Sequence, residues 1–96
     1  MKKYPKSIIT DDMEHCYICG SSNVEIHHCM NGYGIRDKAT KYGLVVPLCR
    51  EHHTQGFYSA HNNEDLKLFF KKLAQERFEK LHGKEKFMEE FHKNYL

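Results

Sequence analysis

The chain has 96 residues, the size of one small domain. A domain this small hides only about 60 to 65% of the surface of its unfolded chain, so such domains often carry disulfides or a structural metal. The formal net charge of +2 excludes the strongly basic character of many nucleic-acid-binding domains and leaves the partner open. Four cysteines and eight histidines direct attention to metal binding.

The N-terminal residues 1–10 are polar and carry lysines, with no apolar stretch typical of a signal peptide. No other segment approaches the roughly 20 apolar residues of a membrane span. We therefore expect a cytoplasmic protein that does not enter a membrane. In a reducing compartment a Cys-x-x-Cys pair favours a metal site over a structural disulfide.

Two short segments are expected to form an antiparallel β-hairpin. Residues 24–28 alternate in polarity at their start, and residues 44–48 are a short apolar run, both of which are typical of strands. The connection between them opens with Asn31-Gly32-Tyr33-Gly34 and closes at Gly43. These residue types accept positive φ, so we expect an exposed, adaptable loop.

The last third of the chain is expected to form two helices. The first begins near Glu64, with Asn62 or Asn63 as its N-cap, and stops at Gly83. The second begins at Lys84. Apolar residues at helical spacing are expected to pack in the core: Leu66, Phe69, Phe70, Leu73, Phe78 and Leu81 in the first helix, and Phe87, Met88, Phe91 and Tyr95 in the second.

These elements predict one α+β domain over residues 1–96. Residues 16–61 form its metal-bearing core, and residues 62–96 form its C-terminal helical part. His82 and His92 lie near helix ends and are expected on the surface.

Four residues have the spacing of a structural zinc site. Cys16 and Cys19 are separated by two residues, and so are Cys49 and His52, which lets each pair reach one tetrahedral Zn²⁺. The alternative is that the cysteines are simply small buried residues. A redox role is disfavoured because no βαβ pattern surrounds the first pair. Cys29 is left over and is expected to pack in the core.

Four further histidines lie in or near the same motifs: His27, His28, His53 and His61. Neutral imidazole is a common ligand of transition metals. Neighbouring side chains on a strand point to opposite faces, so His27 and His28 are not expected to be equivalent ligands of one ion. Successive helical residues turn by about 100°, so His52 and His53 are expected to serve different sites.

The spacing of His53 and His61 predicts that no continuous helix joins them. An unbroken helix would hold their Cα atoms about 12 Å apart, too far for two ligands of one ion. We therefore expect a break near Gly56, after which the chain loops back through Tyr58-Ser59-Ala60.

The order of these motifs resembles the HNH endonucleases, particularly small phage-type members. The resemblance covers residues 16 to about 61 and is carried by Cys-x-x-Cys, then Glu25-Ile26-His27-His28, then Val46-Pro47-Leu48-Cys49-Arg50-Glu51-His52-His53. In that family two strands and a helix form a ββα-metal site, often beside a structural zinc. For a phage-encoded protein, the expected compartment is the host cytoplasm.

By position, the resemblance implies that His27, His53 and His61 bind one catalytic divalent ion, which is Mg²⁺, Mn²⁺, Ni²⁺ or Zn²⁺. It implies that His28 is the general base. The implied activity is metal-dependent hydrolysis of phosphodiester bonds in nucleic acid, with DNA as the expected substrate. Basic residues of the loop beside the site are expected to contact phosphates, unless they form only a solvated face: Arg36, Lys38 and Lys41.

The chain departs from the family pattern at two points. The family's middle asparagine, which orients the base histidine, falls near Leu44 by spacing, and Asn31 comes too early to replace it obviously. Seven residues separate His53 from His61, where three are commoner. Either a backbone carbonyl orients His28 in a divergent active site, or the chain is a catalytically inactive zinc-binding module that binds DNA or a protein partner. The second reading predicts one metal ion per chain.

Overall fold

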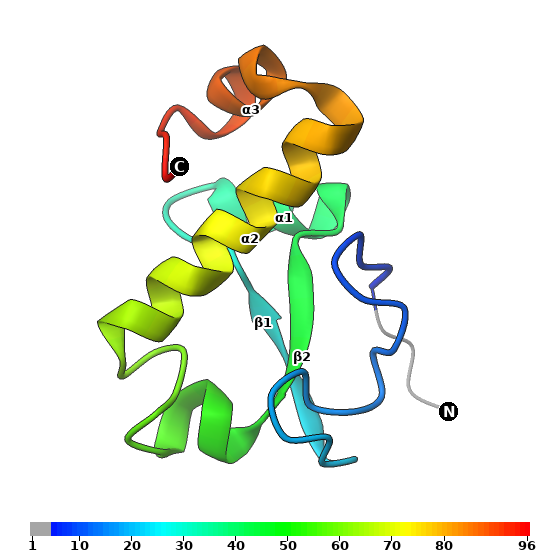
Figure 1. Ribbon diagram of the computed structural model, residues 1–96, viewed down its shortest axis with the longest axis vertical. Helices are drawn as coiled ribbons and strands as arrows, with labels where there is room; N and C mark the ends of the chain where they lie inside the picture. The colour runs from blue at the N-terminus through cyan, green and yellow to red at the C-terminus, as the bar shows by residue number, and fades with distance from the viewer. Residues whose placement is uncertain (1–4) are drawn as a thin grey trace.

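A computed structural model describes residues 5–96 of the chain. Within this range the elements follow in the order β1 (Val24–His28), α1 (Ile35–Tyr42), β2 (Val45–Cys49), η1 (Glu51–Gln55), α2 (Glu64–His82) and α3 (Lys84–Phe91). The two strands form an antiparallel hairpin, and the long helix α2 crosses it (Figure 1). The expected α+β class, hairpin and two C-terminal helices are therefore confirmed.

Strand β2 is buried along its whole length. It begins and ends one residue later than expected, and its register sets Val24 opposite Cys49 and His28 opposite Val45. The segment around Ser7 lies beside the start of β2, where the Ser7 hydroxyl donates to the carbonyl oxygen of Val45 at 2.7 Å. This contact satisfies a backbone acceptor that the two-stranded sheet leaves over.

Helix α1 was not predicted, because the sequence between the strands was expected to be a loop. The eight helical residues are mostly polar, and their apolar stripe is only three residues long: Ala39 is buried, and Ile35 and Tyr42 pack partly against the core. Glycines bound it at both ends, with Gly34 at φ 76° and Gly43 at φ 74°. A Cβ on Gly43 would lie 2.8 Å from the carbonyl oxygen of Lys6, so this close approach also requires glycine.

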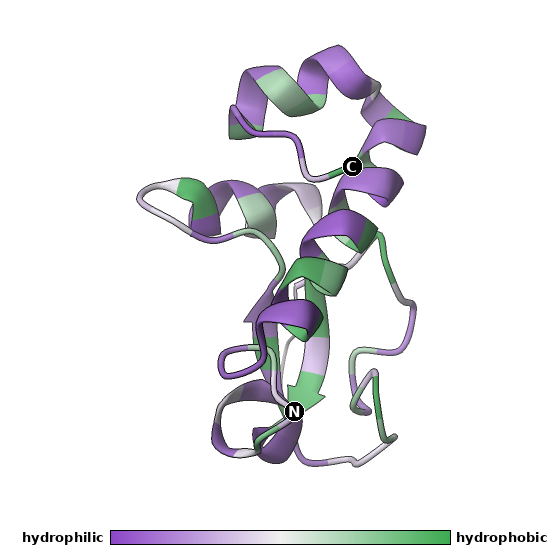
Figure 2. Ribbon diagram, turned by 60° about the vertical axis from the view of Figure 1, so that its left-hand side comes forward, coloured by the Kyte–Doolittle hydropathy of each residue, from purple (hydrophilic) through white to green (hydrophobic). Residues whose placement is uncertain are grey.

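Helix α2 begins with Asn63 as its N-cap, whose side-chain oxygen accepts from the backbone N–H of Leu66 at 3.0 Å. Its buried apolar residues and those of α3 join the hairpin in one core: Leu66, Phe70, Ala74, Phe78, Phe87 and Phe91. Figure 2 shows apolar ribbon segments along β2 and on α2 where the helix passes the hairpin.

The prediction that the whole apolar stripe of the helices is buried was wrong at three positions. Phe69 is 51% exposed, Leu81 is 64% exposed and Met88 is 37% exposed. The reason is that the short hairpin and α3 cover only one side of α2, so the edges of the stripe face solvent. His82 and His92 are exposed, as expected.

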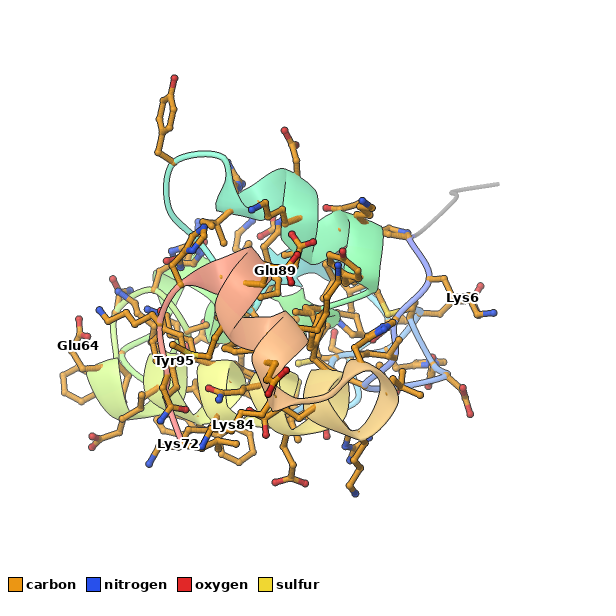
Figure 3. All side chains as sticks on the ribbon, turned by 90° about the horizontal axis from the view of Figure 1, so that it is seen from above. Lys6, Glu64, Lys72, Lys84, Glu89 and Tyr95 are labelled. Carbon is orange, nitrogen blue, oxygen red and sulfur yellow. The ribbon has the colours of Figure 1, made fainter. Side chains whose placement is uncertain are left out.

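Charged side chains surround this core. Lys6 and Glu64 lie at opposite edges of the molecule in Figure 3, and both are exposed, as are Lys72 and Lys84. Within residues 5–96, none of the helices combines the length and apolar character needed to cross a membrane.

Candidate metal centres

The four residues with zinc-site spacing meet at the end of the hairpin where β1 begins and β2 ends. Cys49 is the last residue of β2, His52 lies in η1, and Cys16 and Cys19 come from the turn before β1. One ligand atom from each lies within 4.8 Å of the other three. The chain thus brings together a Cys3His group that can hold one metal ion.

The spacing of the ligand atoms is compatible with zinc. Two thiolates on one tetrahedral Zn²⁺ lie about 3.8 Å apart, and the Sγ atoms of Cys19 and Cys49 are 3.7 Å apart. A thiolate and an imidazole nitrogen on the same ion lie about 3.6 Å apart. Nδ1 of His52 lies 3.2 Å from Sγ of Cys49 and 3.9 Å from Sγ of Cys16, on either side of this value.

Backbone hydrogen bonds prepare the first cysteine for this role. The turn is closed by the N–H of Gly20, which donates to the carbonyl oxygen of Cys16 at 2.9 Å, and Gly20 has φ 81°. Burial raises the pKa of the Cys16 thiol, but the N–H groups of Cys49, Cys19 and Ile18 outweigh it and hold this pKa at about 6. A thiol with this pKa is largely thiolate at neutral pH, which is the form that binds metal.

Cys29 lies outside this group. It is 1% exposed, and burial strongly raises the pKa of its thiol. The expectation that it packs in the core is confirmed.

A second group forms from His27, His53 and His61, whose ligand atoms also lie within 4.8 Å of one another. The break predicted near Gly56 makes this possible. The residues of η1 form one π-helical turn, in which the N–H of Gly56 donates to the carbonyl oxygen of Glu51 at 2.8 Å. The chain then turns back, and the N–H of His61 donates to the carbonyl oxygen of His53 at 3.1 Å.

Two features hold the segment that turns back, residues 56–62 and called the return loop below, in this shape. A Cβ on Gly56 would lie 2.3 Å from the carbonyl oxygen of Glu51, so only glycine fits there. The Asn62 side chain donates to the carbonyl oxygens of Thr54 at 2.7 Å and Gly56 at 3.1 Å. The role of Asn62 was not predicted, because it depends on carbonyl groups that the break exposes.

The nitrogens of the second group converge as ligands of one ion do. Nε2 of His53 and Nε2 of His61 lie 3.2 Å apart, close to the value of about 3.3 Å for two imidazoles on one tetrahedral ion. His27 is 2% exposed, and among residues 5–96 neither of its ring nitrogens has a hydrogen-bond partner. Buried nitrogens without partners are costly unless something else satisfies them, so these residues fit a bound cation.

Burial keeps the His27 ring neutral. Its ring packs against those of His53, His61 and Phe70, with centroids 5.4 to 5.5 Å away. Burial first, and then the neighbouring histidines, lower the pKa of His27 to about 3. Burial, and then the charges of His53, Lys67 and Arg36, lower the pKa of His61. Neutral imidazole is the form that binds a metal ion.

A carboxylate on β1 orients His53. Oε1 of Glu25 lies 2.9 Å from Nδ1 of His53, so the carboxylate accepts Nδ1–H and leaves Nε2 directed at the group. This contact is the first cause of the lowered pKa of Glu25, and Arg50 contributes as well. Glu25 was not singled out from the sequence, although it stands two residues before His27 and therefore on the same strand face.

His28 is separate from the three ligands, as expected from strand geometry. Its ring points to α1, where Nε2 lies 2.9 Å from Oγ1 of Thr40. Burial lowers the pKa of His28, and Arg36 adds to the effect. All four histidines border one pocket of about 450 Å³, which is lined by Ile26, His27, His28, Asn31, Arg36, His53, Thr54 and His61.

The three basic residues of α1 differ in their surroundings. Arg36 lines the pocket. Lys38 donates to the carbonyl oxygen of Glu90 at 2.8 Å and pairs with its carboxylate at 3.6 Å, so it ties α1 to α3. The ammonium of Lys41 lies 5.3 Å from the ring centre of Tyr42. Of the three, only Arg36 borders the histidines.

The asparagine that the family pattern places between the motifs has no counterpart at Leu44, which is fully buried. Asn31 borders the pocket in spite of its early position. Thr40 contacts His28 directly, and nothing in the sequence pattern indicated it, because α1 itself was not predicted. Comparison with protein-family models, curated proteins and solved structures finds no match for this chain.

Proposed function

We propose that this chain is a metal-dependent endonuclease of the HNH type, which hydrolyses phosphodiester bonds in nucleic acid, with DNA as the expected substrate. The observation that carries the proposal is the convergence of three imidazoles, one of them buried and without hydrogen bonds, beside a fourth histidine in one open pocket. A purely structural zinc module needs only the Cys3His group and has no use for this second cluster.

The proposed architecture is a ββα-metal site. β1 supplies His27 and His28, and β2 leads into η1, which supplies His53, while the return loop supplies His61. The Cys3His group then acts as a structural zinc site that fixes the end of the hairpin. This arrangement agrees with the motif order by which the sequence resembles the HNH family.

The roles of the residues follow from their surroundings. His27, His53 and His61 would hold a divalent ion, which would supply Lewis-acid stabilisation of the charge that develops on the phosphate and the leaving 3′ oxygen. His28 lies outside the ligand set and is free to accept the proton of the attacking water. Arg36 binds the phosphate from the α1 side of the pocket. The Glu25 carboxylate keeps His53 in its binding tautomer.

The test is cleavage of a supercoiled plasmid with Mg²⁺, Mn²⁺, Ni²⁺ or no added metal, together with a chelator control. We expect cleavage only with added metal, and we expect His28→Ala to abolish it while the fold and zinc content are retained. His82→Ala is the matched control, because His82 is exposed at the end of α2 and outside both groups. Cleavage that survives His28→Ala contradicts the proposal.

A count of bound metal separates the proposal from the inactive zinc module. Two ions per chain, one of them lost in a His61→Ala variant, support the nuclease. If the chain binds only one ion whichever divalent metal is added, the result supports a module that only binds DNA or a protein partner.

A further inference from the structure

The hydroxyl of Thr40 contacts two groups at once. Its Oγ1 lies 2.9 Å from Nε2 of His28 and donates to the backbone carbonyl oxygen of Arg36 at 3.2 Å. A threonine hydroxyl has one hydrogen to donate and two lone pairs that accept. The carbonyl oxygen of Arg36 can only accept, so the hydroxyl is the donor in that contact and its lone pairs are left to accept from His28.

The tautomer of His28 follows from this assignment of the Thr40 hydrogen. Since the Thr40 hydrogen goes to Arg36, the contact with His28 requires Nε2–H to donate to Oγ1. A neutral imidazole has one N–H, so its Nδ1 then keeps the lone pair and is the basic atom of the ring. Among residues 5–96, no hydrogen bond to Nδ1 of His28 competes for that lone pair.

Thr40 is itself held in place by the packing of α1. Tyr42 donates its hydroxyl hydrogen to Oε1 of Glu90 at 2.8 Å, and Lys38 donates to the carbonyl oxygen of the same residue. These bonds fix α1 against α3. Arg36 precedes Thr40 by four residues, so both lie on the same face of α1.

We propose that Thr40 is the positioning residue of this site, which holds His28 as the Nε2–H tautomer and leaves Nδ1 as the proton-accepting atom. The inference rests on the proposed function, since it assigns the group that orients the general base. A helix absent from the predicted pattern thereby supplies what the family's middle asparagine would supply, at a point where Leu44 has no polar group to offer.

The first test reads the tautomer and needs no activity. Ring ¹⁵N shifts of His28, measured by NMR on zinc-loaded protein at pH 8, are expected to show Nε2–H and unprotonated Nδ1 in the wild type. Thr40→Val removes the hydroxyl and keeps the shape of the side chain, and it is expected to raise the fraction of the Nδ1–H form. Thr40→Ser restores the hydroxyl and the wild-type ratio.

The second test reads the reaction. Thr40→Val is expected to lower kcat about two- to tenfold, the effect of one net hydrogen bond, with KM unchanged and with rescue by Thr40→Ser. Thermal unfolding of the variants checks that the fold persists, which is expected because Thr40 is exposed.

Three results overturn the inference: an Nδ1–H tautomer in the wild type, a tautomer ratio that Thr40→Val leaves unchanged, or a ratio that depends on Asn31→Ala instead. If the wild type cleaves nucleic acid with no metal, the proposed function fails, while the NMR result still decides the role of Thr40.

Discussion

Replacing Glu25 by glutamine tests how strongly the carboxylate on β1 influences the histidine group. Its Oε1 accepts from Nδ1 of His53 at 2.9 Å, and its Oε2 lies 3.4 Å from Nε of Arg50. A carboxylate in this position fixes the histidine tautomer and makes Nε2 a better ligand. Glutamine keeps an acceptor oxygen at almost the same place but removes the negative charge.

The expected magnitude follows from the exposure of the carboxylate. Loss of such a partner typically weakens metal binding by about 10- to 100-fold. The Glu25 side chain is 39% exposed, so water screens part of its charge. We therefore expect Glu25→Gln to weaken binding about tenfold, equivalent to about 1.4 kcal/mol. Glu25→Ala, which also removes the acceptor, is expected to weaken it further.

The measurement is calorimetric titration of Mn²⁺ into protein that already contains zinc. Arg50→Gln is the control, because this side chain is 66% exposed and its contact with Glu25 is expected to change the affinity less than about twofold. The reasoning is refuted if Glu25→Gln binds Mn²⁺ as tightly as the wild type, or if Arg50→Gln weakens binding equally.

Three further predictions concern stability, the return loop and the substrate. In zinc-loaded protein without a second metal, unfolded His27 takes up a proton near pH 6.5, while folded His27 has a pKa of about 3 and stays neutral. The free energy of unfolding is therefore highest above pH 6.5 and falls on acidification. Between pH 8 and 5.5 the free energy of unfolding should fall by about 1.4 kcal/mol. Urea unfolding should show a smaller pH dependence in His27→Leu than in the wild type. An equal pH dependence of the two proteins contradicts the prediction. Gly56→Ala is expected to weaken Mn²⁺ binding while zinc stays bound, because its Cβ would displace the carbonyl of Glu51; a variant that binds both metals normally would show that the turn tolerates the methyl group. Arg36→Gln is expected to reduce the salt slope of DNA binding by about one, whereas the exposed Lys72→Gln is expected to leave it unchanged.

The parts of the site that depend on local spacing were predictable from the sequence. Two residues between Cys16 and Cys19, and two between Cys49 and His52, are enough to indicate one four-ligand group, because a tight turn brings each pair together. The break near Gly56 followed from the requirement that His53 and His61 reach one ion, since a continuous helix would hold them too far apart.

The parts that depend on contacts between distant segments were not predictable. Helix α1 carries an apolar stripe of only three residues, Ile35, Ala39 and Tyr42, between two glycines, which is a weak periodic signal. Thr40 contacts His28 only because α1 packs beside β1, and Asn62 acts on carbonyl groups that the break leaves without helical partners. The exposed Phe69 and Met88 show the same limit from the other side, because periodicity reveals an apolar stripe and not the width of the surface that covers it.

The adjacency of His52 and His53 in η1 has a thermodynamic consequence. One peptide bond joins His52 of the Cys3His group to His53 of the second group. The N–H groups of Ala60 and His61 donate to the carbonyl oxygens of His52 and His53, so the returning chain is bonded to the same two residues. An ion bound at either centre therefore restricts the backbone from which the other is built. Linkage requires this influence to be mutual, so zinc should tighten the binding of the second ion by the same factor by which the second ion tightens the binding of zinc.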